Sequence, residues 1–305
     1  NPGPLPPTAI RAVYREIMSA CLALERPLRV AVLGPQATFS HAAALGVFGS
    51  SSAVVLEPSF FHIFDAVARG EADYGVVPIE NSTEGVVNQT LDAFAESTLE
   101  IVGETVLPIH YCVLASQGTL ADVRHVYSHW QSLAQCRGWL TEHVPEAETH
   151  EMPSTSAAAE YVKGKAGAAA VASEVAAKLY DLEILARRVE DDTTNRTRFV
   201  VIGGNPPKAT GRDKTSIMFS VKHSPGILYR ILGAFADRGI SLTTIESRPM
   251  RGRPWEYVFF VDLDGHRSDP RVAEALDVLR DQCQMMRVLG SYPAAVGEGN
   301  ERAKG

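Results

Sequence analysis

Short apolar runs alternate with amphipathic segments along the first two thirds of the chain. The runs at 28–33, 74–79 and 168–172 have the length and the Val, Ile and Ala content of buried strands. Hydroxyl residues stand where they can cap the helices between these runs, at Thr38, Ser154 and Ser173. The alternation predicts an α/β fold with a mostly parallel sheet.

The pattern changes after residues 205–214, which are rich in Pro and Gly and predict a linker. Strands are then predicted at 215–221, 241–249, 255–263 and 285–292, with helices at 226–238 and 270–283. This βαββαβ order predicts a second, ferredoxin-like domain. The chain thus divides into a leader helix, an α/β domain, a linker, a second domain and a tail, at 1–27, 28–204, 205–214, 215–293 and 294–305.

The leader predicts one amphipathic helix, which Thr8 can cap and which ends near Glu25, before Pro27. Its apolar stripe consists of Ile10, Val13, Tyr14, Ile17, Cys21 and Leu24. A single amphipathic helix cannot bury such a stripe by itself. We therefore expect the leader helix to pack against another part of the protein.

Polar clusters follow several of the predicted strands. Ligands gather at the carboxyl ends of strands in open α/β sheets, so these clusters predict a common cleft. Their members are mostly uncharged, with Arg198 as the main cation: Thr38, Ser40, Glu80, Asn81, Ser82, Ser128, Gln131, Thr155, Asn195, Thr197 and Arg198. The aromatic Phe199 follows the last of these residues and is a further candidate contact. Such a cleft suits a small anion held by hydrogen bonds, and the residues alone leave an enzyme and a non-catalytic sensor both open.

The segment 191–203 (DDTTNRTRFVVIG) passes from a polar run into a β-branched strand predicted at 200–202. In a regular strand Thr197 and Phe199 share one face and Arg198 takes the other. All three side chains reach one ligand only if the strand begins after Phe199.

Composition narrows the function classes. The 305 residues are 45% hydrophobic and carry a net charge of −7, which does not favour a nucleic-acid partner. No apolar run approaches the roughly 20 residues of a membrane span. Four scattered cysteines without a CxxC pair indicate reduced thiols, a cytoplasmic location and no metal site. Neither a P-loop nor GxGxxG occurs, so we expect no nucleotide cofactor.

Several long motifs, in order, resemble those of prephenate dehydratases followed by an ACT regulatory domain. They are GPQATFSH (34–41), DYGVVPIENSTEGVVNQTLD (73–92), SHWQSLAQC (128–136), DDTTNRTRF (191–199), SPGIL (224–228), IESRP (245–249) and VLGSYP (288–293). Three positions depart from the usual pattern of these motifs. Ala37 replaces the usual Gly, Trp130 replaces the usual Pro, and Ile227 replaces a small residue.

The resemblance implies two α/β lobes with the site between them, as in periplasmic binding proteins. It implies loss of CO2 and water from prephenate to give phenylpyruvate, without a cofactor, in a homodimer or homotetramer. Thr197 is implied as the donor to the leaving hydroxyl, and Glu80 as a proton source or as the group that orients Asn81. The other polar residues named above are implied as substrate contacts.

The resemblance also implies feedback inhibition by phenylalanine at the second domain. The implied effector residues are Gly226, Ile227, Leu228, Glu246, Ser247, Arg248 and Pro249. The leader resembles the last helix of the chorismate mutase that precedes dehydratases in bifunctional enzymes. Because only one such helix is present, we expect no mutase activity from this chain.

Overall fold

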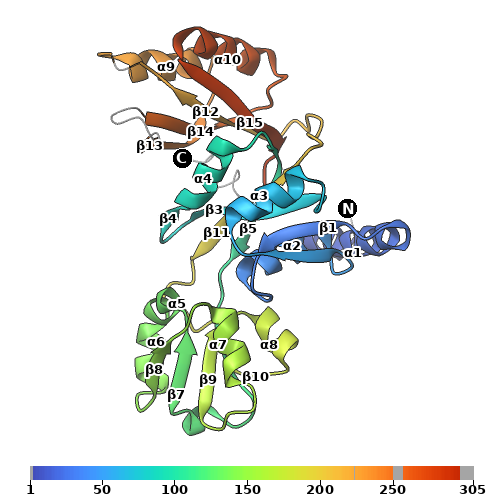
Figure 1. The fold of residues 1–305 in the computed structure, drawn as a ribbon, viewed down its shortest axis with the longest axis vertical. Helices are drawn as coiled ribbons and strands as arrows, with labels where there is room; N and C mark the ends of the chain where they lie inside the picture. The colour runs from blue at the N-terminus through green and yellow to red at the C-terminus, as the bar shows by residue number, and fades with distance from the viewer. Residues whose placement is uncertain (1–2, 223, 250–256, 296–305) are drawn as a thin grey trace. The chain divides into compact units, whose positions relative to one another are not determined.

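The computed structural model describes residues 3–222, 224–249 and 257–295 (Figure 1). By internal contacts the chain forms two compact units, Asn1–Val87 with Val106–Phe199, and Asn88–Thr105 with Val200–Gly305. We call these unit 1 and unit 2. The division differs from the predicted boundary near residue 204, because residues 88–105 group with the second domain. No helix among the described residues is long and apolar enough to span a bilayer.

The first sheet follows the strand order β2-β1-β3-β11-β5, and β4 pairs with β3. The strands are β1 (Arg29–Leu33), β2 (Ala53–Glu57), β3 (Tyr74–Asn81), β4 (Gly85–Val86), β5 (Glu100–Pro108) and β11 (Arg196–Gly203). The β1 strand pairs in parallel with both β2 and β3. The helices of this part are α2 (Phe39–Phe48), α3 (Phe60–Ala68) and α4 (Asn88–Glu96). Along the chain, β5 and β11 each pass from one unit into the other.

A second lobe of unit 1 is built on a mixed sheet with the order β10-β6-β9-β7-β8. Its strands are β6 (Cys112–Ala115), β7 (His125–Ser128), β8 (Glu148–Glu151), β9 (Ala168–Ala172) and β10 (Glu183–Arg187). Its helices are η1 (Leu120–Asp122), α5 (Trp130–Gln135), α6 (Arg137–His143), α7 (Thr155–Val162) and α8 (Glu174–Tyr180). All five residues of β9 are buried, which explains the small side chains of this strand.

Unit 2 contains the predicted βαββαβ arrangement. Its elements are β12 (Asp213–Ser220), α9 (Ile227–Ala236), β13 (Leu242–Pro249), β14 (Tyr257–Asp264), α10 (Pro270–Gln282) and β15 (Met285–Pro293). The antiparallel sheet has the order β13-β14-β12-β15, and residues of α9 and α10 share its apolar core. Residues 255–256 of one predicted strand, and most of the predicted tail, lie outside the described residues.

The leader forms the predicted helix, α1 (Pro7–Glu25), but Pro6 stands at its N-cap and Thr8 does not cap it. The helix packs against α2, as expected, but Val13, Tyr14 and Ile17 of its apolar stripe are more than half exposed. Polar contacts also hold the helix. Arg15 donates to the carbonyl of Gly46 at 2.9 Å, and Glu16 accepts from the Ser50 amide at 2.9 Å.

Candidate functional site

The side chain of Asn81, at the end of β3, is fixed in one orientation. Its Oδ1 accepts the backbone N–H groups of Thr83 at 2.9 Å and Glu84 at 3.0 Å. An amide oxygen that accepts two N–H groups leaves its NH2 group pointing the other way. Asn81 is therefore held as a donor toward the start of β11.

That donor reaches Thr197. Asn81 Nδ2 lies 2.8 Å from Thr197 Oγ1 and 2.9 Å from Asn195 Oδ1, while the Arg196 carbonyl is more distant at 3.3 Å. The Thr197 oxygen accepts this bond, so its own hydroxyl proton remains available for another acceptor. The side chain is largely buried, with 8% of its surface exposed, so a ligand that meets this proton would be mostly shielded from water.

The network continues into the second lobe of unit 1. Asn195 Nδ2 donates to Gln135 Oε1 at 2.9 Å, and Gln135 Nε2 lies 3.4 Å from Glu84 Oε1. Gln135 ends α5 of the second lobe, whereas Asn81 and Glu84 belong to the first. We call Asn81, Asn195, Thr197 and Gln135 the amide relay. It joins the two lobes through neutral groups.

The strand β11 begins at Arg196, earlier than the predicted start at Val200. Thr197 and Phe199 therefore share one face of the strand, and Arg198 lies on the other. Phe199 is 2% exposed and Arg198 is 6% exposed. Of Thr197, Arg198 and Phe199, only Thr197 belongs to the amide relay.

Several other predicted contacts make hydrogen bonds that stabilise the local fold. Thr38 caps α2, accepting the amide of His41 at 3.3 Å, and Ser82 exchanges two hydrogen bonds with the backbone of Arg196. Ser128 is completely buried and donates to the carbonyl of Val171 at 2.6 Å, which argues against direct contact with a ligand. Glu80, Gln131, Ser40 and Thr155 lie at the expected ends of their strands and helices.

The turn between β1 and α2 is a second junction between the lobes of unit 1. The hydroxyl of Ser173 donates to the Ala37 carbonyl at 3.0 Å, and that of Ser156 donates to the Gln36 carbonyl. Ala37 has a φ of 60°, a left-handed conformation that favours the glycine usual at this position. Its methyl group is fully buried in a cluster formed mainly by residues of the second lobe.

The predicted effector residues gather on two elements of unit 2. Gly226 precedes α9 with a φ of 74°, and Ile227 and Leu228 open that helix. Glu246, Ser247, Arg248 and Pro249 end β13. Arg248 Nη2 contacts Asp92 Oδ1 of α4 at 2.8 Å, so the predicted effector strand contacts a helix of the dehydratase segment within unit 2.

Two members of the network were not among the sequence-predicted site residues, namely Gln135 and Glu84. Both stand inside motifs that the sequence singled out, SHWQSLAQC and PIENSTEG. Their roles depend on pairing across 51 residues, which no local pattern could supply.

Two segments of the chain match known protein families. Residues 30–207 match the family model for prephenate dehydratase, and residues 215–281 match that of the ACT domain. The chain is 50% identical over 294 residues to a bifunctional chorismate mutase/prephenate dehydratase of Aquifex aeolicus, covering 96% of this chain and 81% of that protein.

Two solved structures share the fold. Prephenate dehydratase of Arthrobacter aurescens in complex with L-Phe is 38% identical, with a TM-score of 0.81 over 88% of this chain and 90% of that one. A protein described as a quorum quenching acylase is 33% identical, with a TM-score of 0.80 over 87% and 98%. The fold alone therefore does not fix the reaction. The matches of sequence and domain order confirm the predicted fold class, and the chain belongs to the prephenate dehydratase family, with an ACT domain after the dehydratase segment.

Proposed function

We propose that Thr197 donates a hydrogen bond to the ring hydroxyl of prephenate as that group leaves, and that Asn81 aims it. The observation that carries the proposal is the 2.8 Å bond from Asn81 Nδ2 to Thr197 Oγ1. Because Asn81 can only donate in its fixed orientation, Thr197 keeps its proton for the substrate.

A neutral donor suits this reaction. Loss of CO2 and water makes the ring aromatic, so the site needs only to assist departure of the hydroxyl group. A hydroxyl donor in a buried site stabilises charge that develops on the leaving oxygen. The ring carboxylate loses its charge in the product, so strong cationic binding there would favour the ground state.

The pyruvyl carboxylate needs a firmer anchor, for which we propose the start of α2 with Thr38 and Ser40. Arg198 lies on the face of β11 opposite to Thr197, so we do not include it in this anchor. Free backbone N–H groups at a helix N-terminus bind carboxylates. We keep Asn195, Ser82, Gln131, Thr155 and Phe199 as substrate-site residues, and Glu80 as the proton source or as a partner of Asn81. For Ser128 and Phe199, burial favours a role in shaping the site over direct contact.

The decisive experiment replaces the Thr197 hydroxyl. Thr197→Val is nearly isosteric, and loss of one transition-state donor costs about 2.7–4 kcal/mol, or roughly 100- to 1,000-fold in kcat. Thr197→Ser restores the hydroxyl and serves as the control. Phenylpyruvate formation from prephenate is followed by absorbance. An unchanged kcat with only a raised KM would reduce Thr197 to a binding residue.

We further propose that phenylalanine binds the ACT domain and inhibits the dehydratase. The L-Phe complex of the Arthrobacter protein supports this proposal. The carboxylate of phenylalanine would meet the N–H groups at the start of α9, beside Gly226, and the end of β13 would supply the remaining contacts.

A matched glycine pair tests this site. Gly226 and Gly239 both have positive φ, at 74° and 62°, so alanine strains the backbone at either position. We expect Gly226→Ala to weaken phenylalanine binding in calorimetry and Gly239→Ala to leave it unchanged. Equal affinities in both variants would place the effector elsewhere. An assembly of two or four chains and a cytoplasmic location remain predictions, the first open to sedimentation analysis.

A further inference from the structure

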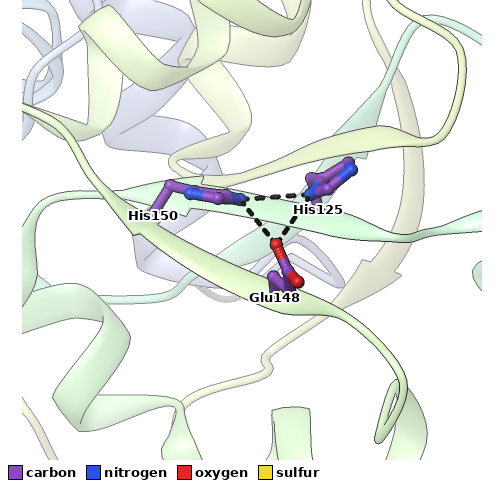
Figure 2. Close-up of side chains that lie close together, drawn as sticks. All are labelled: His125, Glu148 and His150. Carbon is purple, nitrogen blue, oxygen red and sulfur yellow. Dashed lines mark hydrogen bonds and ion pairs between the residues drawn. The ribbon is translucent and has the colours of Figure 1, made fainter.

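Two histidines and a glutamate converge on one face of the second lobe's sheet, in unit 1. His125 opens β7, and Glu148 and His150 lie on the edge strand β8. The parallel register sets His125 beside Glu148 and Tyr127 beside His150, so that all four side chains share a face. Figure 2 shows the two imidazole rings and the carboxylate pointing toward one another.

The spacing of the three donor atoms fits one metal ion. His125 Nδ1 lies 3.1 Å from His150 Nε2, and Glu148 Oε2 lies 3.7 Å and 3.9 Å from these two nitrogens. A point equidistant from the three atoms is about 2.1 Å from each, within the range of roughly 2.0–2.2 Å for zinc bound to His nitrogen or carboxylate oxygen. We propose that these residues bind a divalent transition-metal ion of the zinc class.

The donor set indicates which ion. Two imidazoles and one carboxylate suit Zn²⁺ and its first-row neighbours, whereas Mg²⁺ and Ca²⁺ prefer oxygen ligands alone. A fourth position remains for water. A hydrogen bond between the two rings satisfies the two ring nitrogens and gives Glu148 Oε2 no partner. A cation bound between the rings and the carboxylate would satisfy both nitrogens and this oxygen at once.

The ring of His150 is held in place before an ion arrives. The ring of Tyr127 stacks on His150 with centroids 4.7 Å apart and planes 19° apart. Tyr161 of α7 packs on Tyr127 in turn, at 4.8 Å. The side chains of His125 and His150 are 45% and 38% exposed, which leaves an entry path from solvent.

The position of the ion implies what it does. His125 begins β7 and Ser128 ends it, so the ion lies at the end of the strand away from the predicted substrate contacts. An ion shared by His125, Glu148 and His150 would cross-link the edge strand to the rest of the sheet. We infer a stabilising clip that takes no part in turnover. The sequence predicted no metal site, because the two histidines are 25 residues apart and meet only through strand pairing.

Cobalt titration tests the site directly. The full chain is treated with a chelator, titrated with Co²⁺, and followed by its visible absorption, with Zn²⁺ and Mg²⁺ as competitors. We expect one equivalent of Co²⁺, displaced by Zn²⁺ and not by Mg²⁺. His150→Ala should abolish the signal, and Glu148→Gln should weaken binding at least 10-fold, since a neutral amide is a poorer ligand than a carboxylate.

Two controls separate this site from other binding. His62→Ala removes a histidine of α3 outside the cluster and should leave the titration unchanged. Cys21→Ser removes the exposed thiol, which would otherwise contribute a sulfur-to-cobalt charge-transfer band. Added Zn²⁺ should raise the melting temperature of the wild type and not of His150→Ala. Equal binding by wild type and His150→Ala, with both variants folded by circular dichroism, would overturn the proposal.

Discussion

Two junctions in this molecule are built from different chemistry. In unit 1, the amide relay joins the lobes through neutral donors and acceptors, with Asn81, Asn195 and Gln135 as its amides. In unit 2, charged groups join the α4–β5 segment to the ACT sheet. Lys214 Nζ lies 3.2 Å from Glu104 Oε1, and Arg267 Nη2 lies 2.9 Å from Glu100 Oε2.

The difference teaches what each junction is for. Neutral amides can orient a hydroxyl without adding charge beside a carboxylate that must fragment. Charged pairs in a largely buried setting penalise any arrangement in which a partner is lost, so they fix one way of packing. Arg287, which donates to the carbonyls of Phe94 and Ser97 at the end of α4, adds to this constraint.

Breaking the charged junction should give the largest effect. The side chains of Lys214 and Glu104 are 8% and 0% exposed, so Lys214→Met would remove a cation that lies 3.2 Å from a buried carboxylate. We expect a loss of about 3–5 kcal/mol in the free energy of unfolding, measured with urea. The linker variant Lys208→Met should change little. The double variant Lys214→Met with Glu104→Leu should recover most of the loss, and a double variant as unstable as the single one would contradict this account.

The second largest effect is expected when the donor of the amide relay is replaced by an acceptor. In Asn81→Asp the new carboxylate cannot donate, and it would instead accept the Thr197 proton. Misplacing a catalytic group in this way costs about 100-fold in kcat. Stopped or steady-state assays with prephenate would show it, together with an unchanged circular dichroism spectrum. Gln135→Leu, which removes the next link only, should lose less. A kcat of Asn81→Asp equal to that of the wild type would show that the amide relay does not contribute to the catalytic step.

A smaller effect is expected from Arg248→Met. Hydrogen bonds to charged partners contribute about 1.5–3 kcal/mol, and this pair with Asp92 is mostly buried. Hydrogen exchange should speed up in α4. The exposed pair of Arg280 and Asp277 is the control, and Arg280→Met should cost at most about 1 kcal/mol. Equal exchange in both variants would mean that Arg248 serves only the effector site.

The smallest effect concerns pH. Burial lowers the pKa of His41 below its usual 6.5, and the neutral ring accepts the Ala37 amide on Nδ1 at 2.9 Å. Below pH 6.5 the unfolded chain takes up a proton that the folded chain resists, so stability falls from pH 6.5 down to the folded pKa. Above pH 6.5 this contribution vanishes. Urea midpoints between pH 5 and 8 measure it, and His41→Asn should flatten the slope in the acid range.

The sequence predicted the parts of the fold that have strong local patterns. The ACT arrangement and the caps at Thr38, Ser154 and Ser173 are confirmed. The outer strands β2, β8 and β10 were not predicted. The β8 sequence ETHE has no apolar run, and the apolar runs of β2 (AVVL) and β10 (ILA) are only four and three residues long. Residues 130–143 form two helices, α5 and α6, with Cys136 between them.

For the candidate site, the motifs identified Asn81 and Thr197 but not the bond between them. The two residues are 116 positions apart, and only the pairing of β3 and β11 brings them together. The start of β11 was misplaced because the polar residues before Val200 have no apolar periodicity. They pair as a strand because the Ser82 amide donates to the Arg196 carbonyl and the Ser82 hydroxyl accepts the Arg196 amide, a tertiary cause that local propensity does not contain.

Gly290 of β15 has a consequence for how the chain can be cut. A methyl group at this position would lie 2.1 Å from the carbonyl oxygen of Ile101, so only glycine lets β15 approach β5 here. The β5 strand is the outer strand of its sheet. An uncovered outer strand offers its backbone groups to other chains and promotes aggregation. The ACT domain would then also protect the dehydratase sheet from pairing with other chains. A chain shortened at the linker would precipitate before its loss of regulation could be measured.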